Sequence, residues 1–198
     1  MGRVLTTEEQ DRLFEVAKSN AEWQHVYCAG VLAANTSMRG VEIKHIRRKD
    51  VDLNGRALHI RKSKNEGSKR VLPLNDDALG AVKTMIKRAD QLGHVDPDHY
   101  LWCASQHHKL DPTKPAEKWD TAWRALRDAA GLPKLRFHDL RHTVVTRLLE
   151  AGEPDHVVES ITGHLSRRML EHYSHIRLSA KKRALDRLVS GGKQKHRR

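Results

Sequence analysis

Residues 137–143, FHDLRHT, hold two histidines four positions apart, with an acid and an arginine between them. On a helix, positions four apart share a face, so His138 and His142 could chelate a metal while Asp139 imitates the acid of an HExxH zinc protease. Arg141 indicates a different chemistry, because a guanidinium presents a fixed fork of donors to a phosphate and would repel a divalent ion. The motif by itself leaves a zinc site and a phosphate site open.

The charge balance of the chain favours a polyanionic partner. The formal net charge is +12 at pH 7, and nucleic acid is the commonest polyanion that binds such proteins. Residues 181–198 carry eight Lys or Arg against one acid, which leaves +5 for the first 180 residues. We expect residues 191–198 to form a basic, disordered tail, for which solvation is as good an explanation as a specific contact.

Composition and the chain start predict an intracellular protein with one large domain. The 198 residues suffice to bury a core, and no apolar run approaches the length of a membrane span. The opening MGRVLTTEEQ lacks the apolar core of a signal peptide, so we expect a cytoplasmic location, with the nucleoid as the place of action. Cys28 and Cys103 lie far apart in apolar surroundings and there is no CxxC, which favours buried thiols over a disulfide or metal site.

Apolar periodicity and capping residues predict a mostly helical domain. The expected helices begin at Thr6 or Thr7, cover about 21–35, form a short piece after NTSMRG, run from Asp76 to Gly93, cover 119–130, open on FHDLRHT and end at Gly152, run from Pro154 to Gly163, and cover 167–176 and 179–189. RALHI (56–60) and KRVLPL (69–74) flank the polar turn SKNEGS, which predicts a β-hairpin. The expected fold class is α+β, mainly α-helical, with a small antiparallel β-sheet.

Five separated motifs occur in a fixed order along the chain: TSMRGVEI, SKNEGSKRVLPL, FHDLRHT, ITGHL and HYSHI, preceded by LTTEEQDRLF. Together they resemble the catalytic domain of the tyrosine recombinases, also called phage integrases. Each motif alone is weakly specific, whereas five in order are strong. The resemblance implies a tyrosine-recombinase catalytic domain over residues 1–190, followed by the tail 191–198.

Carried over position by position, the resemblance implies six catalytic residues. They are the two arginines Arg39 and Arg141, the hairpin lysine Lys64, the HxxR histidine His138, the GH-box histidine His164 and the nucleophile Tyr173. Ser37 stands where the family usually has a glycine, and the turn after Lys64 is slightly long, which leaves Lys62 and Lys69 as rivals. His142, His172 and His175 receive no catalytic role.

Phosphoryl transfer requires these residue types. Attack on a phosphodiester adds negative charge to the non-bridging oxygens, and fixed cations and N–H donors aimed at those oxygens stabilise the transition state. Arg39 and Arg141 would supply guanidinium forks, and His164 would supply an N–H. Removing one such donor typically costs about 2.7 to 4 kcal/mol of barrier.

The proton transfers can be assigned to three other side chains. Tyr173 is a poor nucleophile while protonated, since the pKa of a free phenol is about 10, and paired arginines favour the phenolate. His138 could accept the phenol proton or help to bind the phosphate, and the sequence does not choose between these roles. Lys64 is the expected acid for the departing 5′ oxygen. This scheme requires no metal and no other cofactor.

Two further function classes compete with the recombinase interpretation. The helix ending near Glu150, the turn AGEP and the helix to Thr162 resemble a helix-turn-helix, so the chain could bind DNA without cutting it. A type IB topoisomerase shares the chemistry but relaxes supercoils without exchanging strands. Tyr173 argues against a pure binder, and the motif wording favours the recombinase.

The resemblance also implies partners. Double-stranded DNA is the expected partner, with a tetramer assembled on two duplexes and a monomer in the absence of DNA. The helix around Ala184, Leu185 and Leu188 is the expected contact between protomers. Related enzymes carry a core-binding domain before the catalytic one, and whether this chain is a fragment lacking it, its DNA site, its reaction direction and its host are not specified by the sequence.

Overall fold

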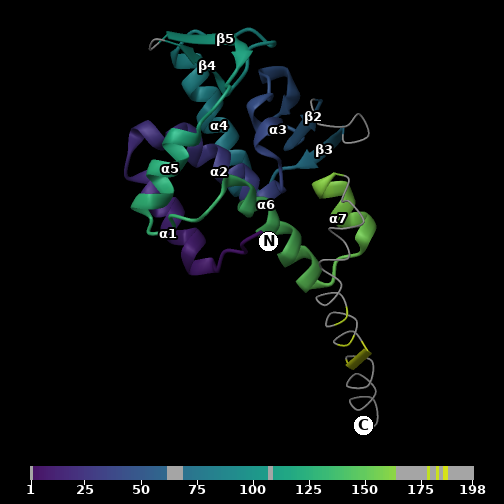
Figure 1. Ribbon diagram of the computed structural model, residues 1–198. Coiled ribbons are helices and arrows are strands. Elements are labelled where there is room, and N and C mark those ends of the chain that lie inside the picture. The colour runs from purple at the N-terminus through teal and green to yellow at the C-terminus, as the bar shows by residue number, and fades with distance from the viewer. Residues whose placement is uncertain are drawn as a thin grey trace, which may run out of the picture.

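The computed structural model describes residues 2–61, 69–106 and 109–163, together with positions 178, 182, 185 and 186 (Figure 1). Its helices are α1 (Thr7–Lys18), η1 (Ala21–Trp23), α2 (Gln24–Thr36), α3 (Gly40–Lys44), η2 (Arg48–Asp50), α4 (Asp76–Gln91), α5 (Asp120–Ala129), α6 (Phe137–Ala151) and α7 (Asp155–Thr162). Its strands are β1 (Val51–Asp52), β2 (Ala57–Ile60), β3 (Arg70–Pro73), β4 (Cys103–Gln106) and β5 (Lys109–Pro115). The expected mainly helical α+β class is confirmed.

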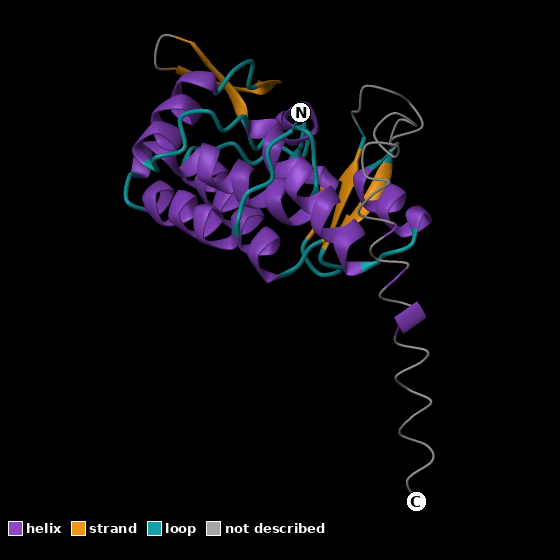
Figure 2. Cartoon of the chain, turned by 60° about the horizontal axis from the view of Figure 1, so that its bottom comes forward, coloured by secondary structure: helices purple, strands orange, loops and turns teal. Residues whose placement is uncertain are grey.

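The predicted hairpin is confirmed as the antiparallel pair β2 and β3, in which Ala57 lies opposite Pro73 and Ile60 opposite Arg70. Two features were not predicted. β1 adds a third strand to this sheet, and β4 and β5 form a separate antiparallel pair. Figure 2 shows the two sheets at different ends of the helical body. The segments CASQ and KLDPTKP lack the apolar alternation that reveals a strand, so the second sheet could not be recognised from its pattern.

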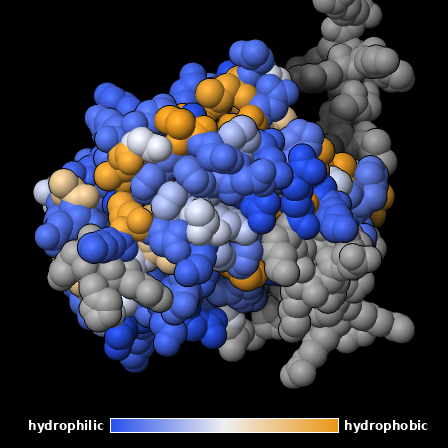
Figure 3. Space-filling view, turned by 90° about the horizontal axis from the view of Figure 1, so that it is seen from above, coloured by the Kyte–Doolittle hydropathy of each residue, from blue (hydrophilic) through white to orange (hydrophobic). Residues whose placement is uncertain are grey.

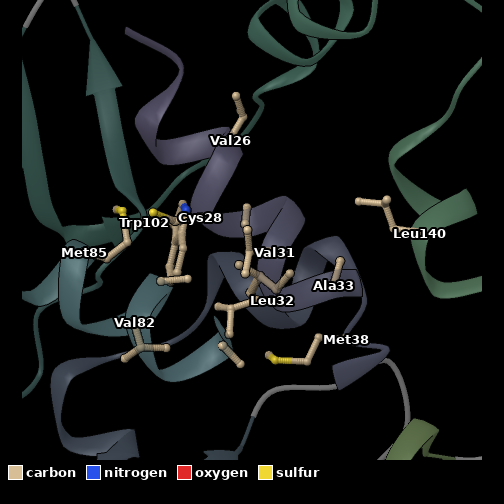
Figure 4. Packing of buried hydrophobic residues seen from close by; sticks show 14 of the residues in the cluster. Val26, Cys28, Val31, Leu32, Ala33, Met38, Val82, Met85, Trp102 and Leu140 are labelled. Carbon is tan, nitrogen blue, oxygen red and sulfur yellow. The ribbon is translucent and has the colours of Figure 1, made fainter. Parts of the chain in front are cut away.

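Helix α2 forms the centre of the core and packs against α1, α4 and α6. It is buried on most sides, because every residue from Val26 to Ala33 except the half-buried Tyr27 is almost fully excluded from solvent. Figure 4 shows Cys28 of α2 near Met85 of α4 and Trp102. Both cysteines are free thiols. Cys28 is buried, as expected, and Cys103 is half-buried. The expected helix 21–35 is split, since a 3₁₀ turn capped by Asn20 precedes α2.

The tryptophans of the α5 segment join α5 to the starts of α3 and α6. The rings of Trp119 and Trp123 lie 4.9 and 5.0 Å from the ring of Phe137, the first residue of α6. Gly40, the first residue of α3, lies so near that an added Cβ would be 3.3 Å from Trp119. The packing of these tryptophans in the core therefore also fixes the N-termini of α3 and α6 beside each other.

The face of the molecule drawn in Figure 3 is mostly hydrophilic. In the space-filling view of Figure 3, apolar side chains are scattered among charged and polar ones. No helix in the described part of the chain combines the length and the apolar character needed to span a bilayer. Lys182, Leu185 and Asp186 have helical backbone, in agreement with the helix expected over 179–189, and the remaining residues of 164–190 lie outside the described residues, apart from Leu178.

Candidate active site

Three of the six predicted catalytic residues lie in the described part of the chain. Arg39 lies on the turn between α2 and α3, and His138 and Arg141 lie in the first turns of α6. Lys64, His164 and Tyr173 fall outside the described residues, as does the rival Lys62. Their positions relative to the arginines remain predictions. The other rival, Lys69, is exposed just before β3.

The turn that carries Arg39 is tight. Ser37 ends α2 in the left-handed region, with φ 59, and is fully buried. A glycine adopts this conformation without steric cost, which gives a physical reason for the glycine preference at this position. Arg39 then returns to extended backbone and its N–H donates to Glu42 Oε2 at 2.8 Å. The turn thereby presents the Arg39 side chain at the start of α3.

Glu42 is a buried carboxylate shared by two arginines. Arg39 Nη1 donates to Glu42 Oε1 at 3.0 Å, and Arg70 donates from Nη1 and Nη2 to the two carboxylate oxygens at 3.1 Å each. The Glu42 side chain is 0% exposed, and those of Arg70 and Arg39 are 8% and 23% exposed. Burial alone would raise the pKa of Glu42, but the hydrogen bonds and charge of Arg70, with those of Arg39, outweigh it and hold the pKa below its ordinary value.

Arg70 also connects this cluster to α7. Its Nε donates to the carbonyl of Ile161 at 2.9 Å. Because Arg70 begins β3, one guanidinium joins the hairpin, α3 and the end of α7. Figure 1 shows α7 beside β3. Together with Glu42, Arg70 is a site-building residue that the sequence analysis did not identify.

Arg141 makes a second connection between the same elements. It is only 2% exposed, and its Nη1 donates to the carbonyls of Ser37 at 2.6 Å and Thr162 at 2.7 Å. One carbonyl belongs to the Arg39 turn and the other to the last residue of α7. The guanidinium thus fixes the two segments on either side of α6.

His138 packs edge to face against His142, with the ring centroids 4.9 Å apart. Burial of part of the ring lowers the pKa of His138 to about 4, helped by the neighbouring His142. The charges of Arg141 and Arg39 act in the same direction. The residue nevertheless keeps an exposed face. At neutral pH the ring is uncharged and can accept a proton.

The acid of FHDLRHT has a structural position. Asp139 is 1% exposed and accepts hydrogen bonds from the backbone N–H groups of Arg136 at 2.9 Å and Arg3 at 3.3 Å. Gly2 packs so closely on the ring of His142 that an added Cβ would clash with it. Within residues 2–61, 69–106 and 109–163, no three His, Cys, Asp or Glu side chains are grouped as metal ligands.

Arg39, Arg70 and Arg141 converge beside Gly163, the first residue of the GH box. An ideal Cβ built on Gly163 would lie 3.2 Å from Arg70 Nη1 and 3.6 Å from Arg39 Nη1. Gly163 also follows Thr162, whose carbonyl accepts from Arg141. The segment leading to His164 therefore starts next to three guanidiniums. Such an arrangement of fixed cations can bind and stabilise an oxyanion.

One sequence signal could have indicated Glu42. It is an acid inside the short apolar helix GVEIK, three residues after Arg39, where a buried acid needs a cation. No local signal identifies Arg70 as its partner, because the two positions are 28 residues apart.

The chain is similar in sequence to known DNA recombinases and integrases. The model described as the phage integrase family matches residues 3–179. A shufflon-specific DNA recombinase of Escherichia coli is 30% identical over 88% of this chain and 40% of its own length. Tyrosine recombinase XerA of Pyrococcus furiosus is 26% identical over 92% of this chain and 60% of its own length. The chain thus spans about half the length of these curated relatives.

Solved structures resemble the fold. A crystal structure of XerA recombinase matches with a TM-score of 0.67 and 25% identity, covering 94% of this chain and 65% of that chain. The Tn1549 transposon integrase in complex with a circular intermediate DNA matches with a TM-score of 0.74 and 19% identity, covering 95% of this chain and 66% of that chain. At that identity the second match supports the architecture alone.

Proposed function

This chain belongs to the phage integrase family, and from that premise we propose that residues 1–190 are the catalytic domain of a tyrosine-type site-specific DNA recombinase. The domain cuts and rejoins DNA strands through a covalent 3′-phosphotyrosine intermediate on Tyr173. The observation that carries this proposal is the convergence of Arg39, Arg70 and Arg141 beside Thr162 and Gly163, next to the GH-box histidine. The recombinases of known sequence and structure that the chain resembles support the same activity.

Arg39 and Arg141 have different roles in the proposed reaction. The Arg39 side chain is 23% exposed and can reach a phosphate from solvent. Arg141 is buried at the floor of the site and held by two carbonyls, so its orientation is fixed before DNA arrives. Charges that are oriented in advance need no reorganisation when the transition state forms. His164, which directly follows Gly163, supplies a further N–H to the same oxygens.

The proton transfers follow from the state of the imidazole. Because the pKa of His138 is about 4, the ring is neutral at physiological pH and can take the Tyr173 proton. The same neutral ring can instead donate one N–H to the phosphate, and both roles remain in the proposal. Lys64, on the turn between β2 and β3, is the acid that protonates the departing 5′ oxygen.

Covalent trapping tests the proposed function. A nicked suicide substrate, from which the 5′ end diffuses away, should trap a protein–DNA adduct on Tyr173 in the presence of excess EDTA. Tyr173→Phe should bind DNA normally and form no adduct, because it lacks the attacking oxygen. Tyr27→Phe, a change at a half-buried tyrosine of α2, is the matched control and should keep the adduct.

The remaining outcomes separate the competing functions. DNA binding by the wild-type chain without any adduct would favour the helix-turn-helix binder, and an adduct that maps to another residue would overturn the mechanism. Relaxation of supercoiled plasmid without strand exchange would favour a topoisomerase. Arg141→Lys keeps the charge but loses the fork, and should lower cleavage by on the order of a hundredfold or more.

The partner proposal is duplex DNA, with four protomers assembled on two duplexes and residues 191–198 as a basic tail. The similarity to the Tn1549 transposon integrase, whose structure was solved in complex with a circular intermediate DNA, supports DNA as the partner. Leu178 and Leu185 are 70% and 63% exposed, which supports a contact with a neighbouring protomer through this part of the chain. Light scattering should find a monomer without DNA, and a stable DNA-free tetramer would contradict the proposal.

A further inference from the structure

A cavity of about 460 Å³ lies between η1, the C-terminal half of α4, the strand β4 and the segment before α5. Its volume falls within the range of small-molecule sites, about 300 to 1,000 Å³. None of Arg39, Glu42, Arg70, His138 and Arg141 lines it. The cavity is therefore separate from the candidate active site, and the proposed recombinase chemistry gives it no role.

A half-buried arginine faces this cavity without a protein acceptor. Arg88, in the last turn of α4, lines the cavity, and the part of the chain that the structure describes provides no hydrogen bond or ion pair to its guanidinium. The two acids on the lining, Glu22 and Glu117, are exposed at its edge and are not paired with Arg88. A half-buried guanidinium without a protein acceptor keeps its N–H donors available to an anion in the cavity.

The charge of Arg88 influences the neighbouring imidazoles. Burial lowers the pKa of His25, and the positive charge of Arg88 lowers it further. Burial and then His99 lower the pKa of His94, and Arg88 acts in the same direction. Arg88 is thus the half-buried cation of the lining, next to two rings with lowered pKa, while the other charged lining residues, Glu22, Glu117 and Lys118, are exposed.

Apolar side chains form part of the lining. Trp102, Leu101 and Met85 are 2%, 4% and 2% exposed, and Trp119 is 7% exposed. Their small exposures show that the core holds these side chains in place, so the apolar edges that they present to the cavity are fixed. Apolar side chains next to the half-buried Arg88 are complementary to a flat apolar molecule that carries an anionic group.

We propose that this cavity is a binding site for a small molecule with a carboxylate or phosphate on a flat apolar body, and that Arg88 is the ligand of its anionic group. The apolar body lies against Trp102 and Trp119. Carboxylate and phosphate ligands of this kind share one anionic oxygen group beside an aromatic ring. Separate probes distinguish a carboxylate from a phosphate.

Cys103 provides the readout, because its half-buried thiol lines the cavity. Alkylation of Cys103 by iodoacetamide, followed by mass spectrometry of its peptide, reports whether the cavity is occupied. Cys28 serves as internal control, since it is 0% exposed and burial raises its pKa to about 12. No DNA is needed, so failure here is distinguishable from failure of the recombinase proposal.

The probes are 2-naphthoate, 2-naphthyl phosphate and the neutral 2-naphthamide. With a dissociation constant of about 1 mM, typical of a probe of this size, about 2 mM of an anionic probe should slow Cys103 alkylation about threefold. The amide should give little protection. Protection by the amide equal to that by both anions, or protection by none of the probes, would overturn the proposal.

Variants identify the anion ligand. Arg88→Gln should abolish the advantage of the anionic probes over the amide, and Arg88→Lys should keep part of it. Lys87→Gln removes a charge from an exposed position on the same helix and should leave protection unchanged. Retained protection in a folded Arg88→Gln chain would contradict the assignment. Should that variant fail to fold, the comparison of anion and amide on the wild-type chain decides.

Discussion

At the scale of single residues, the candidate site is built by shared acceptors. The Glu42 carboxylate binds Arg39 and Arg70, and Arg141 binds the carbonyls of Ser37 and Thr162. Each of these buried groups contacts two segments that are distant in sequence. Three arginines can converge here only because the Glu42 carboxylate and the carbonyls of Ser37 and Thr162 offset their mutual repulsion. We therefore regard Arg70 and Glu42 as positioning residues for Arg39.

Removal of Arg70 tests this positioning role. Arg70→Met should lower the free energy of unfolding by about 3 kcal/mol, because a buried carboxylate loses its bidentate partner. The double variant with Glu42→Gln should lose less than the sum of the single losses, as urea unfolding can show. Lys18→Met, in an exposed pair with Glu15, is the control and should cost less than about 1 kcal/mol. Strict additivity of the two buried changes would rule out the coupling.

The protonation of His138 gives a second prediction. The folded-state pKa of about 4 lies below the ordinary 6.5, so the unfolded chain takes up the proton first as the pH falls. The contribution of this residue to stability is full above about pH 6.5 and is lost as the pH falls toward 4. An NMR titration of the ring, assigned with His138→Gln, should show a midpoint well below 6.5. A midpoint at or above 6.5 would contradict the described surroundings.

At the scale of elements, α6 organises both the site and the chain start. Its first turns carry His138 and Arg141, and its later residues hold the N-terminal segment: Thr143 Oγ1 accepts from the Leu5 N–H at 3.0 Å, and Arg147 Nη1 donates to Gln10 Oε1 at 2.9 Å. Helix α1 begins two residues after Leu5 and contains Gln10. The attachment of α1 to α6 therefore depends on where α1 starts.

The start of α1 can be tested by two neighbouring threonines. Thr6 is the N-cap, since its Oγ1 accepts from the Glu9 N–H and its own N–H donates to the Glu9 carboxylate, both at 3.2 Å. Thr6→Ala should lower the free energy of unfolding by about 1 kcal/mol. Thr7→Ala, one residue inside the helix, is the control, and denaturant unfolding should find a smaller change. Equal effects of the two changes would contradict the cap assignment.

At the scale of the whole molecule, positive charge is unevenly distributed along the chain. The net charge is +12, and +5 of it belongs to the first 180 residues. The described domain thus holds many compensated charges, such as the pairs of Arg136 with Asp139 and Arg48 with Asp90. The excess lies toward the C-terminus, where contacts with phosphates would depend on salt.

This distribution predicts the salt dependence of DNA binding. Affinity for duplex DNA should fall steeply with added salt, because each neutralised phosphate contributes about 0.9 to the logarithmic slope. Deleting residues 191–198, or replacing Lys193, Lys195, Arg197 and Arg198 by Gln, should make the slope shallower to the same extent. Fluorescence anisotropy across salt concentrations measures it. Affinity that stays flat from low to physiological salt would contradict the electrostatic account.

The sequence by itself determined the fold class, most of the helices, the β2–β3 hairpin and the family. These features depend on neighbouring residues: the caps at Thr6 and Asn75 and the apolar stripe of α5 act within a few positions along the chain. The five motifs that indicate the family can likewise be read in order from the sequence, without a structure. The roles of Lys64, His164 and Tyr173 remain predictions of this kind.

Only the tertiary structure decided how the site is held. Three strands, β1, β4 and β5, and the 3₁₀ turn before α2 were missed because segments without alternation carry no periodic signal. The structure also placed Asp139 in the cap of α6, a role that its sequence context had not indicated. The partnership of Glu42 with Arg70, and the reach of Arg141 to Ser37 and Thr162, exist because helix packing brings distant segments together. Burial then makes those contacts obligatory, since a charge removed from water needs a partner wherever the fold provides one.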